Sequence, residues 1–175
     1  MQEKKGNIVV AEDGLLRMIQ DNRAIIYKIC NSYCSNPADR EDLAQEITYQ
    51  LWKSAKNFRS DYKFSTWMYR VALNTAISFH RKEKATTESV PLEERQLELR
   101  DDYEDSGINE ENFNLLQRFI NELRDLDRAL MILYLEEKTY QDIAEILGIT
   151  ETNVATKISR IKENLKQKFS TIKAY

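Results

Sequence analysis

The side chains between residues 152 and 160 are of the types that read a nucleic acid. Hydroxyl and amide groups, which can donate to base edges, are mixed there with cations, which can meet phosphates. From residue 152 to residue 169, basic residues outnumber acidic residues by five to one. The candidate DNA contacts are Thr152, Asn153, Thr156, Lys157, Ser159 and Arg160. A merely solvated face is the alternative interpretation, because most charged runs are of that kind.

Aromatic and basic side chains are interleaved between residues 58 and 82. Rings stack on unpaired bases while cations follow the phosphates, so this pattern indicates binding of single-stranded DNA. The aromatic members are Phe58, Tyr62, Phe64, Trp67 and Tyr69, and the cations are Arg59, Lys63, Arg70, Arg81 and Lys82. For Trp67 and Phe79, burial in a core explains the sequence at least as well as base contact.

A third set of polar side chains follows residue 39. Leu43, Ile47 and Leu51 recur at helical spacing and predict a helix with one buried face. A hydrogen-bonding, acidic strip remains outside that face, formed by Asp42, Gln45, Glu46 and Tyr49. Taken alone, the strip is most simply a solvated face, and a protein partner is the alternative.

The sequence offers little for catalysis or metal binding. His80 is the only histidine and stands among cations, where exposure or a phosphate contact is the better interpretation. Cys30 and Cys34 lie one helical turn apart, which favours reduced, partly buried thiols, and with one distant histidine they complete no zinc site. We therefore expect no enzyme activity, no metal and no cofactor.

Two short helices must position the candidate DNA contacts between residues 152 and 160. Thr139 can cap a helix with Asp142 three residues later, and Gly148 can end that helix in the left-handed conformation. Thr150 can cap the next helix, whose buried stripe is expected to be Val154, Ile158, Ile161 and Leu165. This is a helix-turn-helix, and its second helix would enter the major groove.

The whole chain reads as all-α, because it has only four glycines, two prolines and no sustained strand-type alternation. We expect two small helical domains joined by a flexible acidic linker, with the helix-turn-helix in the second. Residues 86–112 hold ten acidic and two basic residues, whereas residues 1–85 hold ten and fourteen. The predicted segments are an N-terminal tail (1–14), a first domain (15–85), the linker (86–112) and a second domain (113–175).

The N-terminus has no apolar run long enough for a signal sequence, and no window approaches a membrane span. We therefore expect a cytoplasmic protein.

Taken together, these segments resemble a bacterial RNA polymerase sigma factor of the extracytoplasmic-function (ECF) group. The resemblance rests on DREDLAQEITYQLW, FSTWMYRVALNTAISFHRK, the acidic linker and TYQDIAEILGITETNVATKISRIKENL, in that order. It covers about residues 15–170. The family departures are Arg124 in place of a proline and Lys138 in place of a glycine, and both affect helix starts more than function.

The resemblance implies a role for each set. The acidic strip would grip the β′ clamp of core RNA polymerase, through Asp39, Asp42, Gln45, Glu46 and Tyr49. The minus-ten element would be melted and a flipped base captured by Phe58, Arg59, Tyr62, Lys63, Phe64, Trp67, Tyr69, Arg70, Asn74 and Arg81. The helix from Glu151 would read the minus-thirty-five element.

The family also implies partners: the β′ and β subunits of core polymerase, promoter DNA and an anti-sigma factor. The linker would thread through the polymerase's basic RNA path, although its composition alone fits a solvated connector. The alternative function is a stand-alone helix-turn-helix regulator that binds duplex DNA without polymerase. That alternative leaves the aromatic and basic segment unexplained, and the chain shows no evident dimerisation segment.

Overall fold

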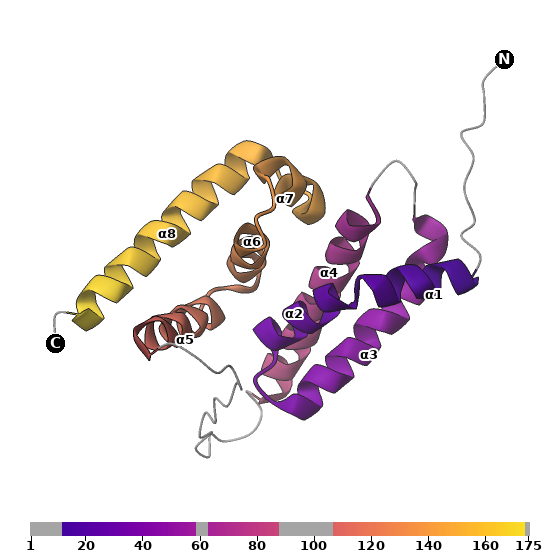
Figure 1. Cartoon of the computed structure of the whole chain (residues 1–175), viewed down its shortest axis with the longest axis horizontal. Helices are drawn as coiled ribbons and strands as arrows, with labels where there is room; N and C mark the ends of the chain where they lie inside the picture. The colour runs from indigo at the N-terminus through magenta and orange to yellow at the C-terminus, as the bar shows by residue number, and fades with distance from the viewer. Residues whose placement is uncertain (1–11, 59–62, 88–106, 174–175) are drawn as a thin grey trace. The chain divides into compact units, whose positions relative to one another are not determined.

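A computed structural model describes residues 12–58, 63–87 and 107–173 of the 175-residue chain. These residues form helices joined by turns and contain no β-strand, so the all-α prediction is confirmed (Figure 1). Contacts between Cα atoms divide the chain into two compact units, Met1–Pro91 and Leu92–Tyr175. Within the described ranges, no helix combines the length and apolar character needed to cross a membrane.

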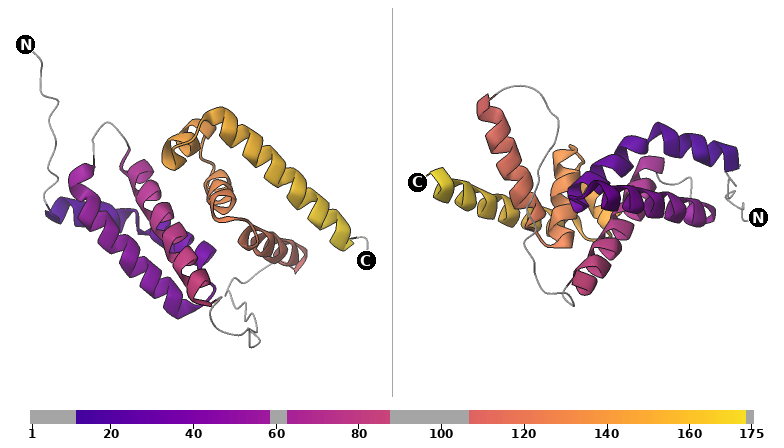
Figure 2. Two further views of the ribbon diagram at one scale, coloured as in Figure 1. Left: turned by 180° about the vertical axis from the view of Figure 1, so that it is seen from behind. Right: turned by 90° about the horizontal axis from the view of Figure 1, so that it is seen from below.

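The first unit is built on three long helices that pack against one another, α2 (Arg23–Tyr33), α3 (Pro37–Ser54) and α4 (Phe64–Thr87). Helix α1 (Glu12–Asp21) packs on α2, and a short 3-10 turn, η1 (Ala55–Asn57), follows α3 (Figures 1 and 2). The predicted apolar face of α3 is confirmed. Leu43, Ile47 and Leu51 are fully buried. They share the core with fully buried side chains of α2 and α4, among them Ile29, Met68 and Leu73.

The start of α3 is tied to the end of α2. Asn36 accepts a hydrogen bond from the backbone N–H of Ala38 at 2.9 Å, and Pro37 occupies the first helical turn. Arg40 donates from Nε to the carbonyl oxygen of Cys34 at 2.9 Å. These contacts hold the start of α3 against the end of α2, and the buried apolar face of α3 leaves its polar strip outward.

The described part of the second unit has four helices, α5 (Gly107–Asn121), α6 (Asp125–Leu135), α7 (Tyr140–Leu147) and α8 (Glu151–Lys173). Helices α6, α7 and α8 pack together, and α5 contacts α6. The buried Arg128 donates to the carbonyl oxygen of Asn121, so a cation meets the C-terminal end of α5. The rings of Phe119 and Phe169 meet edge to face at 5.1 Å, which brings α5 to α8.

The boundaries of the predicted linker differ from the helix boundaries. Helix α4 continues to Thr87, and α5 begins at Gly107, so residues 86–87 and 107–112 are helical. The rest of the predicted linker, like the predicted N-terminal tail apart from its last three residues, lies outside the described residues.

The helix-turn-helix forms as the sequence predicts. Thr139 accepts from the backbone N–H of Asp142 at 3.1 Å, and its hydroxyl donates to the carboxylate of the same residue at 2.7 Å. Gly148 ends α7 with φ of 68°, in the left-handed region. The hydroxyl of Thr150 accepts from the N–H of Asn153 at 3.2 Å and caps α8. All four members of the predicted stripe of α8 are buried, namely Val154, Ile158, Ile161 and Leu165.

The turn before α7 contains a second left-handed residue. Glu137 has φ of 55°, and among the described residues it is the only non-glycine with positive φ. The sequence analysis placed the missing family glycine at Lys138. In the structure, the residue of this turn with the conformation that favours glycine is Glu137, one position before Lys138.

We expect opposite stability effects at these two turns. A Cβ added to Gly148 would meet no atom within 4 Å, so Gly148→Ala should lose only the backbone cost of the left-handed conformation, about 1 kcal/mol. Glu137→Gly should relieve a similar cost, and after the greater entropy loss of glycine it should stabilise by about 0.5 kcal/mol. Urea unfolding of the full chain measures both. Changes of the same sign would contradict the two backbone assignments.

Candidate DNA-binding and partner-binding surfaces

The exposed face of α8 carries most of the predicted duplex-reading residues. Because the apolar stripe turns inward, the opposite face is left for a ligand. The side chains exposed there are Glu151, Thr152, Asn153, Thr156, Ser159 and Arg160. The hydroxyl of Thr156 donates to the carbonyl oxygen of Thr152 at 2.9 Å, one turn earlier. The hydrogen-bonding groups and the guanidinium therefore stand on one side of one helix.

Lys157 is placed differently from these six residues. Its side chain is 27% exposed, and its Nζ lies 3.3 Å from Oδ1 of Asp127 on α6. The exposed face of α8 and this flank are thus chemically distinct.

Two further lysines of α8 contact neighbouring helices. Lys162 donates to the phenol oxygen of Tyr134 at 3.2 Å and stands 5.2 Å from the centre of that ring. This hydrogen bond raises the pKa of Lys162. Lys168 is paired with Glu122 of α5 at 2.5 Å. The basic excess seen in the sequence is therefore partly engaged inside the unit.

An aromatic cluster stands at the start of α4. The ring centres of Phe58, Phe64 and Trp67 are 5.3 to 5.5 Å apart, and all three side chains are half-buried. The sequence allowed Trp67 to be either a core residue or a base contact. The structure agrees with each in part, because the ring packs on its neighbours and keeps some exposed surface. Two predicted contacts, Arg59 and Tyr62, lie outside the described residues.

The remaining predicted minus-ten residues follow along α4. Lys63, Asn74 and Arg81 are exposed, and Arg70 is half-buried. Tyr69 is different: its side chain is only 3% exposed and belongs to the core. The sequence interpretation of Tyr69 as a surface contact therefore needs correction, because the α4 face that carries Met68, Ala72 and Ala76 also turns Tyr69 inward.

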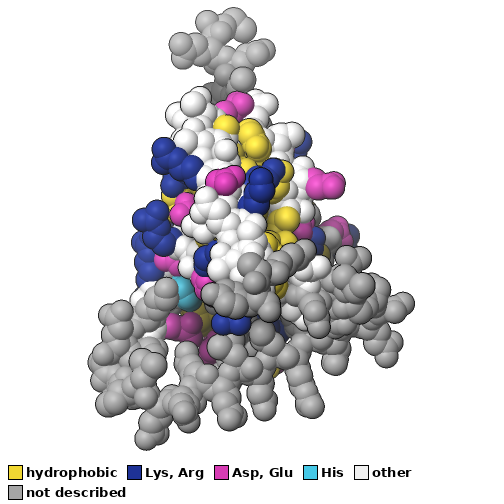
Figure 3. Space-filling view, turned by 90° about the vertical axis from the view of Figure 1, so that its left-hand side faces the viewer, with side chains coloured by type: hydrophobic (Ala, Val, Ile, Leu, Met, Phe, Trp, Pro, Cys, Tyr) yellow, Lys and Arg dark blue, Asp and Glu magenta, His cyan; other side chains and the backbone are white. Residues whose placement is uncertain are grey.

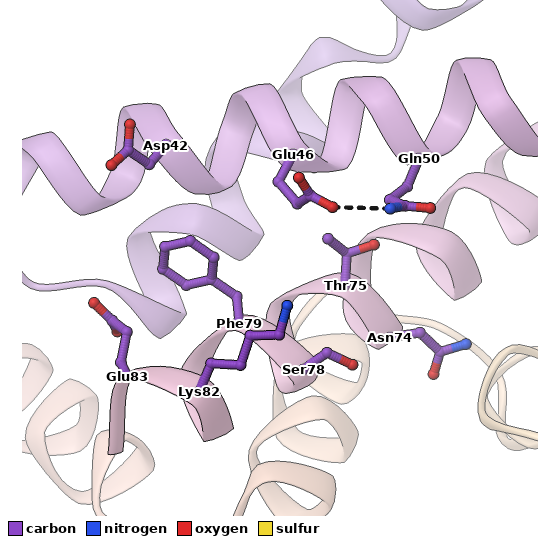
Figure 4. Close-up of a pocket in the computed structure, with 9 residues that line it drawn as sticks. All are labelled: Asp42, Glu46, Gln50, Asn74, Thr75, Ser78, Phe79, Lys82 and Glu83. Carbon is purple, nitrogen blue, oxygen red and sulfur yellow. Dashed lines mark hydrogen bonds between the residues drawn. The ribbon is translucent and has the colours of Figure 1, made fainter. Parts of the chain in front are cut away.

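The acidic strip of α3 is at the surface. Asp42, Gln45, Glu46 and Tyr49 are exposed, and Asp39 is half-buried. Glu46 accepts from Nε2 of Gln50 at 2.8 Å. With residues of α4, Asp42 and Glu46 also line a groove of about 840 Å³, into which the ring of Phe79 points (Figure 4).

Trp52 extends this surface and was missed in the sequence analysis. It is 54% exposed, and with Tyr49, Gln45 and Leu16 it lines a mainly apolar groove of about 490 Å³ between α1 and α3. Its spacing could have revealed it, since it stands three residues after Tyr49 and seven after Gln45. Large apolar side chains are exposed there beside hydrogen-bonding groups, which is typical of a surface that binds a protein.

Charges of both signs are mixed around exposed apolar side chains on the face drawn in Figure 3.

The described residues gather no set of three His, Cys, Asp or Glu side chains that could hold a metal ion. His80 meets Tyr33 edge to face with ring centres 6.1 Å apart, and its ring is half-buried. Cys30 and Cys34 are free and buried at the end of α2. Burial raises the pKa of Cys30 to about 11 and that of Cys34 to about 12.

Comparisons with known proteins identify a family for both parts of the chain. The family model Sigma-70 region 2 matches residues 18–86, and Sigma-70, region 4 matches residues 113–165. The ECF RNA polymerase sigma factor SigW of Bacillus subtilis is 31% identical over 95% of this chain and 92% of its own length. The ECF RNA polymerase sigma-E factor of Haemophilus influenzae is 30% identical over 77% of this chain and 76% of its own.

Two solved structures share the fold. One is the sigma factor RpoE in complex with the anti-sigma factor NepR from Bartonella quintana, with a TM-score of 0.69, 19% identity, and coverage of 90% of this chain and 96% of that chain. The other is CnrH in complex with the cytosolic domain of CnrY, with a TM-score of 0.65, 14% identity, and coverage of 92% and 90%.

The two thiols should react slowly in the folded protein. Near pH 8, a pKa raised from 9.0 to about 11 lowers the thiolate fraction of Cys30 about a hundredfold, and that of Cys34 falls further. Alkylation by iodoacetamide, followed by mass spectrometry, should be at least that much slower in the native chain than in urea. The rate should rise about tenfold per pH unit up to the raised pKa. Rapid native labelling of either cysteine would contradict its burial.

Proposed function

The chain belongs to the ECF group of RNA polymerase sigma factors, and we propose that its three surfaces divide the work of promoter recognition among polymerase, duplex DNA and melted DNA. It binds core RNA polymerase, directs it to specific promoters and helps to melt them. The carrying observation is that one chain holds an exposed acidic and aromatic strip on α3 and an exposed polar face on the second helix of a helix-turn-helix. Neither surface alone would distinguish a sigma factor from other helical proteins.

Duplex DNA is read by α8. The exposed hydroxyl, amide and guanidinium groups of its N-terminal half suit base edges and phosphates of the minus-thirty-five element in the major groove. The cap at Thr150 supports this placement, because it holds the first turn of the helix in order next to the DNA.

Melted DNA is held by the first unit. Extracting a base from the stack costs a few kcal/mol, which stacking and pocket contacts must offset. The cluster of Phe58, Phe64 and Trp67 offers preorganised aromatic surface for this purpose. Lys63, Asn74 and Arg81 supply exposed cations and an amide along α4. Tyr69 supports that helix from the core.

Polymerase is gripped by α3. Asp42, Gln45, Glu46 and Tyr49 would contact the β′ clamp, and Trp52 would add the apolar part of the contact. An exposed aromatic beside a polar rim is the usual composition of a binding hot spot. The acidic linker would occupy a basic path on the same enzyme, and the β subunit would be a further contact. Binding of the linker in that path would account for the net negative charge of the chain.

Free DNA binding should be weak. The net charge is −3, so few phosphates can be neutralised by the chain alone, and affinity for the promoter comes from simultaneous attachment to polymerase. This argues against the stand-alone regulator. The action takes place in the cytoplasm, where polymerase and DNA meet, and binding rather than catalysis performs it.

An anti-sigma factor is the proposed regulatory partner. The similar structures hold RpoE with the anti-sigma factor NepR and CnrH with the cytosolic domain of CnrY. A protein that covered the exposed strip of α3 would compete with polymerase directly.

Loss of the strip should weaken core binding. We expect Asp42→Ala with Glu46→Ala, or Trp52→Ala alone, to raise the Kd for core polymerase at least about tenfold, because interface anchors of this kind typically cost more than 1 kcal/mol. Fluorescence titration of the labelled full chain with core enzyme measures this. The control Asp21→Ala removes an exposed carboxylate at the end of α1 and should leave the Kd unchanged. Equal affinities for all variants would refute the role of the strip.

Loss of the α8 guanidinium should weaken upstream-element binding. Arg160→Ala is expected to lower the affinity of the polymerase complex for a promoter fragment about tenfold, the usual cost of one base-edge or phosphate contact. Arg118→Ala serves as the control, since it removes an exposed arginine from α5. A gel-shift titration compares them. If Arg118→Ala weakened the complex and Arg160→Ala did not, α8 would not be the reading helix.

A further inference from the structure

Not all the cations of α8 are available to DNA. Lys157 is held by Asp127 of α6, and Lys168 is held by Glu122 of α5. Arg160 and Lys166 are exposed, and neither forms an ion pair with any residue in the described part of the chain. The helix therefore carries two classes of cation, one engaged inside the unit and one open to a ligand.

We propose that Asp127 withholds Lys157 from the DNA backbone, so that Lys157 is a positioning residue of α8 and not one of its phosphate contacts. This inference rests on the proposed function, because it concerns how α8 meets duplex DNA. It replaces the sequence interpretation of Lys157 as a contact.

The surroundings of the Lys157–Asp127 ion pair favour keeping it intact. The Asp127 side chain is 16% exposed, and its second oxygen, Oδ2, lies 3.5 Å from Nη2 of the exposed Arg124. Water and salt screen a pair in this position less than a fully exposed pair. Asp127 also stands in the first turn of α6, where the helix dipole favours its negative charge. Both oxygens of Asp127 therefore have a cation as partner.

Release of Lys157 would be unfavourable near DNA. If its amine moved to a phosphate, Asp127 would keep, among the described residues, only the solvent-exposed Arg124 as a partner. A less compensated carboxylate would then stand on the helix that packs against the DNA-reading helix, and it would repel the phosphates. By contrast, the pair as it stands links α6 to the flank of α8 and holds the helix in register with its support.

The consequence is a smaller phosphate footprint. Each phosphate contact adds about 0.9 to the slope of log affinity against log salt concentration. Asp127 should therefore lower general DNA affinity by the equivalent of one contact. Promoter choice then depends more on the base-reading groups and on polymerase.

The test is the salt dependence of duplex binding. Fluorescence anisotropy of the full chain with a short duplex of random sequence is measured over a potassium chloride series. Asp127→Asn frees Lys157, and we expect the slope to steepen by about 0.9, which is about threefold more affinity lost over a fourfold rise in salt. Lys157→Gln should leave the wild-type slope unchanged. The double variant should return to the wild-type slope, because no cation remains to be freed.

Glu163→Gln is the matched control. It removes one exposed carboxylate from α8 itself without releasing a described cation, since the contact of Glu163 is with Gln167. An equal steepening in Glu163→Gln and Asp127→Asn would show a general charge effect and overturn the proposal. A slope shallower by about 0.9 in Lys157→Gln would also overturn it, because Lys157 would then already contact a phosphate.

If Asp127→Asn fails to fold, judged by circular dichroism, the Lys157→Gln slope decides the question alone. If the chain alone binds the duplex too weakly to measure even at low salt, the same salt series is run with the polymerase complex on a promoter fragment, and equal slopes for wild type and Asp127→Asn there would overturn the inference. Normal wild-type binding with a failed slope prediction would overturn the inference only.

Discussion

The inward packing of one apolar stripe determines what the second unit can bind. Once Val154, Ile158, Ile161 and Leu165 are buried against the neighbouring helices, the helix period leaves one face of α8 for solvent, and the groups that can read DNA stand on it. The left-handed Gly148 allows the stripe of α8 to pack inward, because it lets the chain end α7 and start α8 within a few residues. The helix caps, the packing of α6 and α7, and the ion pairs of α8 with α5 and α6 all help to hold α8 in this orientation.

In the first unit, too, a buried apolar face determines which side chains of a helix are exposed. Leu43, Ile47 and Leu51 turn inward, so α3 presents carboxylates, an amide and two aromatic rings outward. The hydrogen bond from Arg40 to the end of α2 ties the start of that helix to its neighbour. In both units, a buried stripe specifies a binding surface by exclusion. The proposed polymerase-binding and DNA-reading surfaces are thus each specified by the packing of a small helical unit.

Local signals in the sequence predicted much of this arrangement, and long-range ones did not. The caps at Thr139 and Thr150 and the glycine at 148 depend on neighbouring residues, so they can be read from the chain directly. Tyr69 was misplaced because its burial depends on which face of α4 meets the other helices. The partner of Lys157 lies thirty residues away on α6, and periodicity carries no information about such a pair. The left-handed conformation of Glu137 was not predicted, because a non-glycine residue gives no local signal for it.

The central claim is that this chain gives core polymerase a promoter preference. Run-off transcription with purified core enzyme on a library of genomic fragments, with and without the chain, tests it most directly. The account predicts new transcripts that start downstream of two shared sequence elements, one in the region that melts and one farther upstream. An unchanged transcript set, together with tight binding of the chain alone to specific duplexes, would contradict the account and establish a regulator that works without polymerase.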